Sequence, residues 1–432
     1  MKILFLHKQI LFPRDTGGKI RVLNLLVHLG KRHAIDYVCT LRPGEEIHLP
    51  AMRDLGLNLE TVPAREPRRG SLGFYAQALR NLAASIPYNV ARNTDPALRE
   101  RCADLIARRD YDLVICDTVI MVNHLLNLAV LSDATTRPAL ILFQHNVESQ
   151  ILKRHAEVAG NPLKRAYMAA QYRRMVRFEA EAGRAFDRVI AVSEADRQTF
   201  MNFYGWDHVD AIETSVDLDY FQPWPQPRRR DRVVFVGSMD WMPNQDGVRR
   251  FLKTIWPRIR QARPEATFQV VGRRPPLEFT AGFDGRDGVE VVGTVPDVRP
   301  YLAEASVAVV PLWVGGGTRL KIYEAMAMAT PVVSTAIGAE GLPLTPGHHY
   351  LQANDDATFA QAVADLLANP DRAHNLGRIA HTFVASRFGT EPIAAQFEGV
   401  CQRTLETRTS SQGVGPPMRV RATISLRKPT LP

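Results

Sequence analysis

A short apolar strand, a loop that ends in glycine and a helix begin this chain, and the same order of elements begins again in its second half. In the first half, an apolar run at residues 2–6 leads to Gly17 and Gly18, which precede apolar residues at helical spacing. Further β-branched or apolar runs predict strands at residues 34–40, 112–116, 139–143 and 188–192. Strands that alternate with helices in this way are typical of a doubly wound parallel sheet.

The second half restarts the pattern after a proline-rich stretch. Residues 221–230 are predicted to form a linker, because proline disfavours both helices and central strands. A strand at residues 232–236 then ends at Gly237, and the next strand ends at Gly272. Further strands are predicted at residues 289–292, 307–310 and 331–334. The chain is therefore expected to be an α/β protein with two Rossmann-like domains, whose strand carboxyl ends face one central cleft.

These patterns also predict the domain boundaries. The first Rossmann-like domain is expected at residues 1–222, a linker at 223–231 and the second domain at 232–388. A helix at 389–407 is expected to pack back on the first domain. The Ser/Pro/Arg-rich residues 408–432 are expected to be a disordered basic tail.

Composition narrows the class of protein. Of 432 residues, 45% are hydrophobic and 23% are charged, as in ordinary globular proteins. Cys39, Cys102, Cys116 and Cys401 lie far apart without a CxxC pair, which disfavours a disulfide framework or zinc site and favours a reducing compartment. No stretch approaches the roughly 18 apolar residues of a membrane span. A cytoplasmic protein is expected, with the inner face of the membrane as a further location, and the net charge of +9 suits anionic partners.

Residues 311–335 contain the most informative stretch. Glycines, Gly316 and Gly317 among them, let the backbone approach a ligand, and Thr318 is placed to cap the helix that follows. Free N–H groups at a helix start bind anions, and Arg319 adds positive charge in the first turn. An anionic ligand is therefore expected at this glycine-to-helix junction.

The same helix carries a second cation and a carboxylate. Lys321 lies in its first turn, and Glu324 follows on the same face, where a carboxylate can accept hydrogen bonds from vicinal sugar hydroxyls. A diphosphate at the helix start, with a ribose one turn further in, matches a nucleoside diphosphate. The alternative interpretation is a glycine turn followed by a Lys321–Glu324 surface pair.

Residues 324–335, Glu-Ala-Met-Ala-Met-Ala-Thr-Pro-Val-Val-Ser-Thr, resemble the donor-binding helix and strand of the retaining glycosyltransferases of family four, which have the GT-B fold. Further matching pieces occur in the family's order at residues 17–18, 143–148, 191–193, 216–217, 234–237 and 270–272. Residues 237–244 and the Gly-Gly-Gly-Thr-Arg-Leu-Lys variant are most similar to the exopolysaccharide-type sugar transferases associated with PEP-CTERM systems. The resemblance covers about residues 1–405.

This resemblance implies an acceptor-binding first domain and a donor-binding second domain. The implied reaction moves a sugar, with retention, from a nucleotide-diphosphate-sugar to a glycan or lipid-linked acceptor in exopolysaccharide biosynthesis. Gly17 and Gly18 match the loop that approaches the donor phosphates and sugar. His145 matches the family's inward-pointing histidine and would contact the sugar or acceptor, although a lone histidine after a strand is more often structural. Glu324 matches the ribose-binding glutamate, so His145 and Glu324 are the predicted catalytic residues.

Three positions depart from the family pattern. Gly316 stands where the family usually has a glutamate, and Ser238 and Asn244 lie where an arginine and a lysine usually clamp the diphosphate. Residues 213–215 replace the usual Pro-Asn-Gly before the linker aspartate. Either this subgroup neutralises the phosphates differently or its activity is reduced. The predicted donor-binding residues are Gly17, Gly18, Gly237, Ser238, Arg273, Gly316, Gly317, Thr318, Arg319, Lys321 and Glu324, of which Arg273, Arg319 and Lys321 are the candidate clamp.

No metal and no cofactor are expected, because GT-B enzymes of this type need none. Residues 110–112 and 217–219 fit the DxD pattern of another transferase fold, but are interpreted as structural or capping aspartates. Cationic side chains and helix-terminal amides would instead stabilise the departing nucleoside diphosphate.

The basic stretches at residues 65–80 and 153–184 have two interpretations. They are either solvated amphipathic helices or a surface for an anionic membrane, which would suit a lipid-linked acceptor; nucleic acid is not an expected partner. Two other functions remain open: a nucleotide-sugar epimerase of the same fold, and a non-catalytic nucleotide-sugar-binding protein, which the absent glutamate at position 316 favours slightly. A Rossmann oxidoreductase would need a G-x-G-x-x-G motif that residues 7–18 lack.

Overall fold

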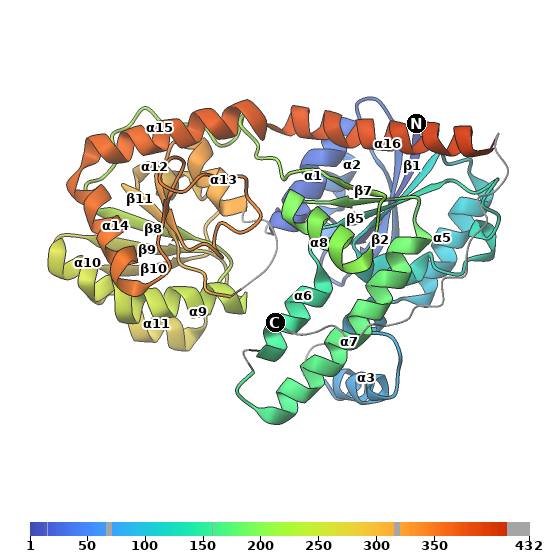
Figure 1. Ribbon diagram of the computed structural model, residues 1–432, viewed down its shortest axis with the longest axis horizontal. Coiled ribbons are helices and arrows are strands. Elements are labelled where there is room, and N and C mark those ends of the chain that lie inside the picture. The colour runs from blue at the N-terminus through green and yellow to red at the C-terminus, as the bar shows by residue number, and fades with distance from the viewer. Residues whose placement is uncertain (15, 66–70, 158, 315–319, 413–432) are drawn as a thin grey trace.

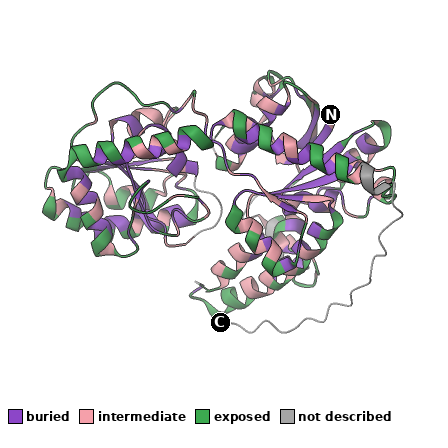
Figure 2. Cartoon of the chain, turned by 45° about the horizontal axis from the view of Figure 1, so that its top comes forward, coloured by how far each residue is buried: buried purple, intermediate pink, exposed green. Residues whose placement is uncertain are grey.

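The computed structural model describes residues 1–432 except residues 15, 66–70, 158, 315–319 and 413–432. Within the described residues, the chain forms two α/β domains that lie side by side (Figure 1). Each domain has one parallel sheet covered by helices, and buried strands form its centre while the outer helix faces are exposed (Figure 2). The expected fold class is therefore confirmed.

The first sheet has seven parallel strands in the order β3-β2-β1-β4-β5-β6-β7. Every residue of β4 and β5 is buried, because helices cover both faces of this central part. Because the strand order reverses at β1, the switch point of the sheet lies between the carboxyl ends of β1 and β4. The strands are β1 (Lys2–Gln9), β2 (Ala34–Leu41), β3 (Asn58–Pro63), β4 (Leu113–Asp117), β5 (Ala139–Gln144), β6 (Arg188–Ala191) and β7 (Val209–Ala211).

The helices of the first domain pack on this sheet, except that α6 and α7 form a hairpin that projects from it with α3 beside α7 (Figure 1). Along α7, Met175, Phe178 and Ala182 are buried at helical spacing and fix the hairpin to the domain. The helices are α1 (Gly17–Leu29), η1 (Glu46–His48), α2 (Leu49–Arg53), α3 (Leu72–Leu82), α4 (Tyr88–Asn93), α5 (Pro96–Arg108), η2 (Val119–His124), η3 (Ala129–Leu131), α6 (Glu148–Glu157), α7 (Pro162–Ala185) and α8 (Glu194–Tyr204).

The second sheet has six parallel strands in the order β10-β9-β8-β11-β12-β13. The helical segment after its first strand contains a π turn at Phe251–Ile255, just before Pro257, whose missing N–H interrupts the helical hydrogen bonds. The strands are β8 (Arg232–Val236), β9 (Thr267–Val271), β10 (Val289–Gly293), β11 (Val307–Val310), β12 (Val332–Ser334) and β13 (Leu351–Gln352). The helices are α9 (Met242–Arg250), η4 (Phe251–Ile255), α10 (Trp256–Ala262), α11 (Leu277–Phe283), α12 (Arg299–Glu304), α13 (Leu320–Ala327), α14 (Asp356–Ala368), α15 (Pro370–Arg387) and α16 (Thr390–Gln412).

The last helix returns to the first domain. Figure 1 shows α15 on the second domain and α16 running across the top of the first. The Phe397 ring of α16 meets the Phe143 ring of β5 at 5.2 Å between centroids, and Glu398 accepts a hydrogen bond from His33 at 2.8 Å. Helix α16 continues to Gln412, beyond the predicted end at Thr407, so residues 408–412 are helical; the rest of the predicted tail lies outside the described residues. Among the described residues, no helix combines the length and apolar character needed to cross a membrane.

Candidate active site

Helices α1 and α13 begin close to each other, one in each domain. The glycine pair predicted to end a loop instead starts α1, because Thr16 caps the helix by accepting a hydrogen bond from the Lys19 N–H. A Cβ atom at Gly17 would lie 3.9 Å from Leu320, the first described residue of α13. Unpaired N–H groups and the positive end of a helix dipole favour anions at such helix starts. The space between the two helix starts therefore suits an anionic ligand.

The side chain of Lys321 reaches from α13 to the carboxyl end of β8. Its Nζ donates a hydrogen bond to Asn244 Oδ1 at 2.9 Å and lies 4.5 Å from the centre of the Phe235 ring. Asn244 also donates from Nδ2 to the Ser238 carbonyl oxygen at 2.8 Å. Asn244 occupies the region where the resemblance leads one to expect a cation, and the structure brings the cation there from α13.

The absence of a side chain at Gly237 leaves room for Lys321 at the end of β8. A Cβ atom at Gly237 would come within 2.5 Å of Lys321 Nζ and 3.0 Å of Asn244 Nδ2. A Cβ atom at Gly272, at the end of β9, would lie 1.8 Å from the Gly237 carbonyl oxygen. The two strand ends therefore lie close together because neither position carries a side chain.

Arg273 and Glu324 complete the described part of the second-domain site. Arg273 Nε lies 3.2 Å from Asp240 Oδ2, so this guanidinium is held beside the loop that follows β8. Glu324 is half-buried on α13, and burial raises its pKa to about 7, although the nearby Lys321 opposes the shift. A carboxylate that titrates near neutrality can change its hydrogen bonding within the physiological pH range.

The other residues predicted at this junction, Gly316, Gly317, Thr318 and Arg319, lie outside the described residues. Their predicted contacts with an anion, the helix cap at Thr318 and the candidate clamp at Arg319 stay predictions. The described site therefore joins Gly17, Gly18, Gly237, Ser238, Arg273, Lys321 and Glu324.

His145 lies directly after β5, on the first-domain side. Its Nδ1 would be 3.6 Å from a Cβ atom at Gly18, which places the ring beside the start of α1. Its Nε2 lies 2.8 Å from Asp117 Oδ1, and the other oxygen of that carboxylate lies 3.0 Å from His7 Nε2. Sequence reasoning missed Asp117 and His7, whose only signal was that each is a polar residue at the carboxyl end of a buried strand.

Burial and charge set the titration of this group. Burial lowers the pKa of His145, and Arg21 and His7 lower it further, against the opposing effect of Asp117. Burial by itself would raise the pKa of Asp117, but the facing histidines hold it well below the usual range. The carboxylate is therefore ionised at neutral pH.

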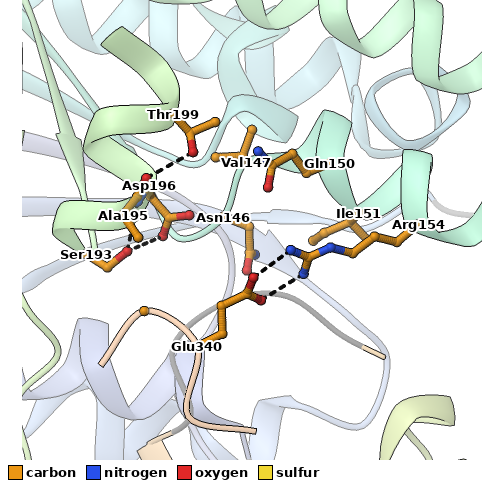
Figure 3. A pocket seen from close by; sticks show the side chains of 11 residues that line it. Asn146, Val147, Gln150, Ile151, Arg154, Ser193, Ala195, Asp196, Thr199 and Glu340 are labelled. Carbon is orange, nitrogen blue, oxygen red and sulfur yellow. Dashed lines mark hydrogen bonds and ion pairs between the residues drawn. The ribbon is translucent and has the colours of Figure 1, made fainter. Parts of the chain in front are cut away.

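A small cavity of about 70 Å³ between the domains lies next to His145. Figure 3 shows the Arg154 side chain of α6 reaching the Glu340 carboxylate, and the two hydrogen bonds between them measure 2.9 and 2.7 Å. These residues join the first domain to the segment after β12. The cavity is lined by Asn146, Val147, Gln150, Ile151, Arg154, Ser193, Ala195, Asp196, Thr199, Glu340 and Gly341.

Residues 213–215, which differ from the family pattern, lie beside the buried Arg21. Arg21, one turn into α1, donates a short hydrogen bond to the Thr214 hydroxyl. Burial lowers the pKa of Arg21 to about 10 and raises that of Glu213 to about 7. The loop that replaces Pro-Asn-Gly therefore holds a cation one turn beyond the glycine pair.

The two DxD patterns have structural contacts. Asp217 Oδ1 accepts hydrogen bonds from the N–H groups of Asp219 and Tyr220, and Asp112 Oδ2 accepts one from the Lys2 N–H at 2.7 Å. In the described parts of the chain, no three His, Cys, Asp or Glu side chains gather so that they could hold a metal ion.

The chain matches two family descriptions and several known proteins. "Glycosyltransferase Family 4" matches residues 16–220, and "Glycosyl transferases group 1" matches residues 230–369. A Klebsiella pneumoniae protein, described as an uncharacterized 44.6 kDa protein in the cps region, is 20% identical over 407 residues, which are 91% of this chain and 97% of that protein.

Solved structures show the same fold. Sucrose-phosphate synthase from Thermosynechococcus elongatus has a TM-score of 0.70 and 18% identity, over 94% of this chain and 100% of that one. Anabaena HepE in complex with UDP and glucose has a TM-score of 0.67 and 16% identity, over 93% of this chain and 100% of that one. Because the two family matches together span nearly all of residues 16–369, the chain belongs to the GT-B glycosyltransferases of family four.

Proposed function

We propose that this glycosyltransferase transfers a sugar from a nucleotide-diphosphate-sugar to a glycan or lipid-linked acceptor in the synthesis of a cell-surface exopolysaccharide. The observation that carries the donor class is the meeting of two helix starts with Lys321 and Glu324. Anabaena HepE, which shares the fold, was solved with UDP and glucose, and the Klebsiella relative comes from a cps region, which supports the donor class and the polysaccharide role respectively.

Each side of the site has a role in this proposal. The starts of α1 and α13, with Lys321 and Arg273, bind the diphosphate, and Glu324 binds the ribose hydroxyls. His145 faces the transferred sugar. These cationic and amide groups stabilise the charge that develops on the departing phosphate, so the reaction needs no metal ion and no cofactor.

The reaction proceeds with retention at the anomeric carbon. The acceptor oxygen bonds to the anomeric carbon on the face that the phosphate leaves, while the bond from that carbon to the phosphate oxygen breaks. The acceptor proton passes to the same phosphate oxygen, so the products are the glycosylated acceptor and a nucleoside diphosphate. The first domain binds the acceptor and the second, at residues 232–388, binds the donor.

The α3–α7 surface suits a peripheral contact with an anionic membrane. Leu72, Leu79 and Leu163 are 90%, 71% and 82% exposed, and the exposed cations Arg80 and Lys164 adjoin them in the sequence. Helix α3 is held to α7 because Arg174 donates hydrogen bonds to the carbonyl oxygens at positions 81 and 82. Exposed leucines beside cations favour the interface of a negatively charged bilayer. A cytoplasmic enzyme at the inner face of the membrane would meet a lipid-linked acceptor there.

The donor is identified by incubating the protein with UDP-, GDP-, ADP- and dTDP-sugars and measuring nucleoside diphosphate release. The reactions are run with and without lipid and glycan extracts, and with EDTA to test for a metal. Acceptor-dependent release that survives EDTA supports the proposal, and NMR of the product's anomeric proton tests retention. Sugar interconversion without release identifies an epimerase, and neither reaction identifies a binding protein.

A further inference from the structure

Three adjacent parallel strands bring His7, Asp117 and His145 together. Strand β4 pairs with β1 on one side and with β5 on the other, so the side chains that follow these strands meet at the switch point of the sheet. Asp117 is only 1% exposed and lies 2.8 Å from His145 Nε2 and 3.0 Å from His7 Nε2. One buried carboxylate therefore faces two imidazole rings.

The turn after β4 holds this carboxylate in place. Thr118 has φ 74°, a backbone conformation that a threonine rarely adopts, and its N–H donates to the Phe143 carbonyl oxygen at 2.8 Å. The next N–H, of Val119, donates to the buried Gln144 Oε1 at 2.7 Å. Both bonds hold the end of β4 against the end of β5, where His145 follows. Such a strained turn is maintained only where the surrounding structure fixes it.

The contact with Asp117 determines which nitrogen of His145 carries the proton. An ionised carboxylate has only lone pairs to offer, so the nitrogen that faces it at 2.8 Å must present an N–H group. In the neutral ring the other nitrogen, Nδ1, then has a lone pair. Within the described residues Nδ1 has no hydrogen-bond partner, and it lies beside the Gly18 position at the start of α1.

We infer that Asp117 is a positioning residue that holds His145 in the Nε2–H tautomer, so that Nδ1 presents a hydrogen-bond acceptor to the sugar side of the cleft. The role of Nδ1 as an acceptor rests on the proposed function, because it requires a bound sugar whose hydroxyl group donates a hydrogen bond to Nδ1. A hydroxyl that donates to Nδ1 is bound, whereas a group that can only accept is repelled. Asp117 therefore contributes to recognition of a hydroxylated sugar without touching it.

His7 supports the same arrangement from the other side. Its Nε2 faces Asp117, and its Nδ1 lies 2.7 Å from both the Gln9 carbonyl oxygen and the Tyr37 hydroxyl. The His7 ring therefore has a polar neighbour at each nitrogen, and the carboxylate faces one imidazole ring at each of its two oxygens. The charged and titratable groups around His145 are Asp117 on β4, His7 on β1 and Arg21 on α1.

The tautomer is measured directly on the full chain labelled with ¹⁵N-histidine, by long-range ¹H–¹⁵N spectra at pH 7 without any donor. A His145→Gln sample assigns the signal. His124 is an internal control, because its Nε2 accepts from the Asp95 N–H and its Nδ1 faces the Met121 carbonyl oxygen, both at 2.9 Å. We expect the Nε2–H tautomer at His145 and the opposite Nδ1–H tautomer at His124 in one spectrum.

Asp117→Leu removes both acceptor oxygens and keeps the branched shape of the side chain, with a larger methyl group in place of each oxygen. We expect His145 to become a mixture of tautomers while the His124 signals stay unchanged. Two results would overturn the inference. One is a wild-type His145 with its proton on Nδ1, and the other is a pure Nε2–H tautomer in the leucine variant. If the leucine variant does not fold, the wild-type spectrum still decides the tautomer. Asp117→Asn keeps one acceptor oxygen. Its rate of donor turnover then serves as the second measurement.

The second measurement is the turnover of the identified donor by wild type and by the two Asp117 variants. Loss of a residue that orients a metal-bound histidine typically costs about 10- to 100-fold in activity, and we expect a loss of this order when Asp117 no longer orients His145. We expect this loss in kcat/KM for the donor with Asp117→Leu, and a smaller loss with Asp117→Asn. Equal kcat/KM in wild type and both variants contradicts a positioning role. If no sugar is turned over while the spectrum shows the expected tautomer, the proposed function fails and the assignment of the proton stands.

Discussion

Lys321 Nζ and Asn244 Oδ1 lie 2.9 Å apart, across the space between α13 and α9. This hydrogen bond holds a positive charge at the carboxyl end of β8 although β8 and α9 contribute no cation at that point. The family resemblance leads one to expect a lysine in the region of Asn244. In this chain the positive charge comes instead from α13, which brings Lys321 beside Asn244.

Lys321→Met is expected to weaken the binding of UDP about 10- to 100-fold, the size of a lost hydrogen bond to a charged group. Asn244→Ala should have a smaller effect, because it frees the Lys321 ammonium without removing it. Isothermal titration calorimetry with UDP, or with whichever of ADP and GDP binds more tightly, measures both. Lys253→Met, an exposed lysine in the same domain, is the matched control. Equal affinities of the Lys321 variant and wild type would exclude Lys321 from the phosphate site.

Gly237→Ala is expected to weaken UDP binding with little change in stability. The new Cβ atom would come within 2.5 Å of Lys321 Nζ, and the end of a flexible side chain can move aside where a backbone cannot. The fold should therefore lose about 1 kcal/mol, the lower end of the cost of added volume, whereas the displaced ammonium no longer reaches the ligand. Gly282→Ala is the control, because nothing lies within 4 Å of its Cβ position. A thermal unfolding curve and a UDP titration are recorded for each variant, and unchanged UDP affinity in the Gly237 variant contradicts the prediction.

Glu324 is expected to make donor binding tighten as the pH rises through 7. Burial raises its pKa to about 7, so the carboxyl group is protonated below that pH and ionised above it. Only the ionised form accepts hydrogen bonds from both ribose hydroxyls. UDP-glucose is the suitable probe, because its phosphates do not titrate between pH 6 and 8. Glu324→Gln should bind it equally across that range, and Glu324→Ala should cost a few kcal/mol at most, the order of one charged hydrogen bond. A wild type as insensitive to pH as the glutamine variant would remove Glu324 from the site.

Glu148→Gln is expected to stabilise the fold at pH 8.5 and to leave it unchanged near pH 4. Burial and the neighbouring Glu179 raise the pKa of Glu148 to about 7, above its value in an unfolded chain. The folded protein therefore binds more protons between about pH 4.5 and 7, and stability falls as the pH rises through that window. Removing the ionisation should recover on the order of 2–3 kcal/mol above pH 7.

Urea unfolding at both pH values measures this effect. Glu157→Gln, at the exposed end of the same helix, is the control, because its carboxyl group is 58% exposed. A glutamine variant at position 148 that is no more stable than wild type at pH 8.5 would show that Glu148 is not held in a desolvated site.

The sequence predicts the two sheets well, because their central strands are continuous apolar runs buried on both faces, as in β4 and β5. Strands β3, β7 and β13 were missed, since they are short or lie at sheet edges where half-exposed residues give no clear pattern. The sequence shows the glycine pair at residues 17–18 but predicts a loop there, because the pattern does not mark Thr16 as the residue that caps α1.

The site was only partly predictable. Lys321 and Glu324 share one helix, so their spacing alone places them on one face. Asp117 and His7 lie on β4 and β1, which come next to each other only in the folded sheet, where β5 is the other neighbour of β4. A single aspartate at the end of a strand also has no distinguishing sequence pattern. Asn244 was recognised only as a departure, because its hydrogen bond to Lys321 joins residues 77 positions apart.

The chain passes between the domains twice, and the two passages are bonded to each other. The Val216 N–H donates to the Phe388 carbonyl oxygen at 2.8 Å, and Phe388 stacks on the Tyr323 ring of α13 at 4.6 Å between centroids. Because the two crossings lie side by side and are bonded to each other, rotation of one domain about the line through them is the relative motion that would disturb these contacts least. Because Tyr323 of α13 stacks on Phe388 at one of these crossings, such a rotation would change the distance from Lys321 and Glu324 to His145.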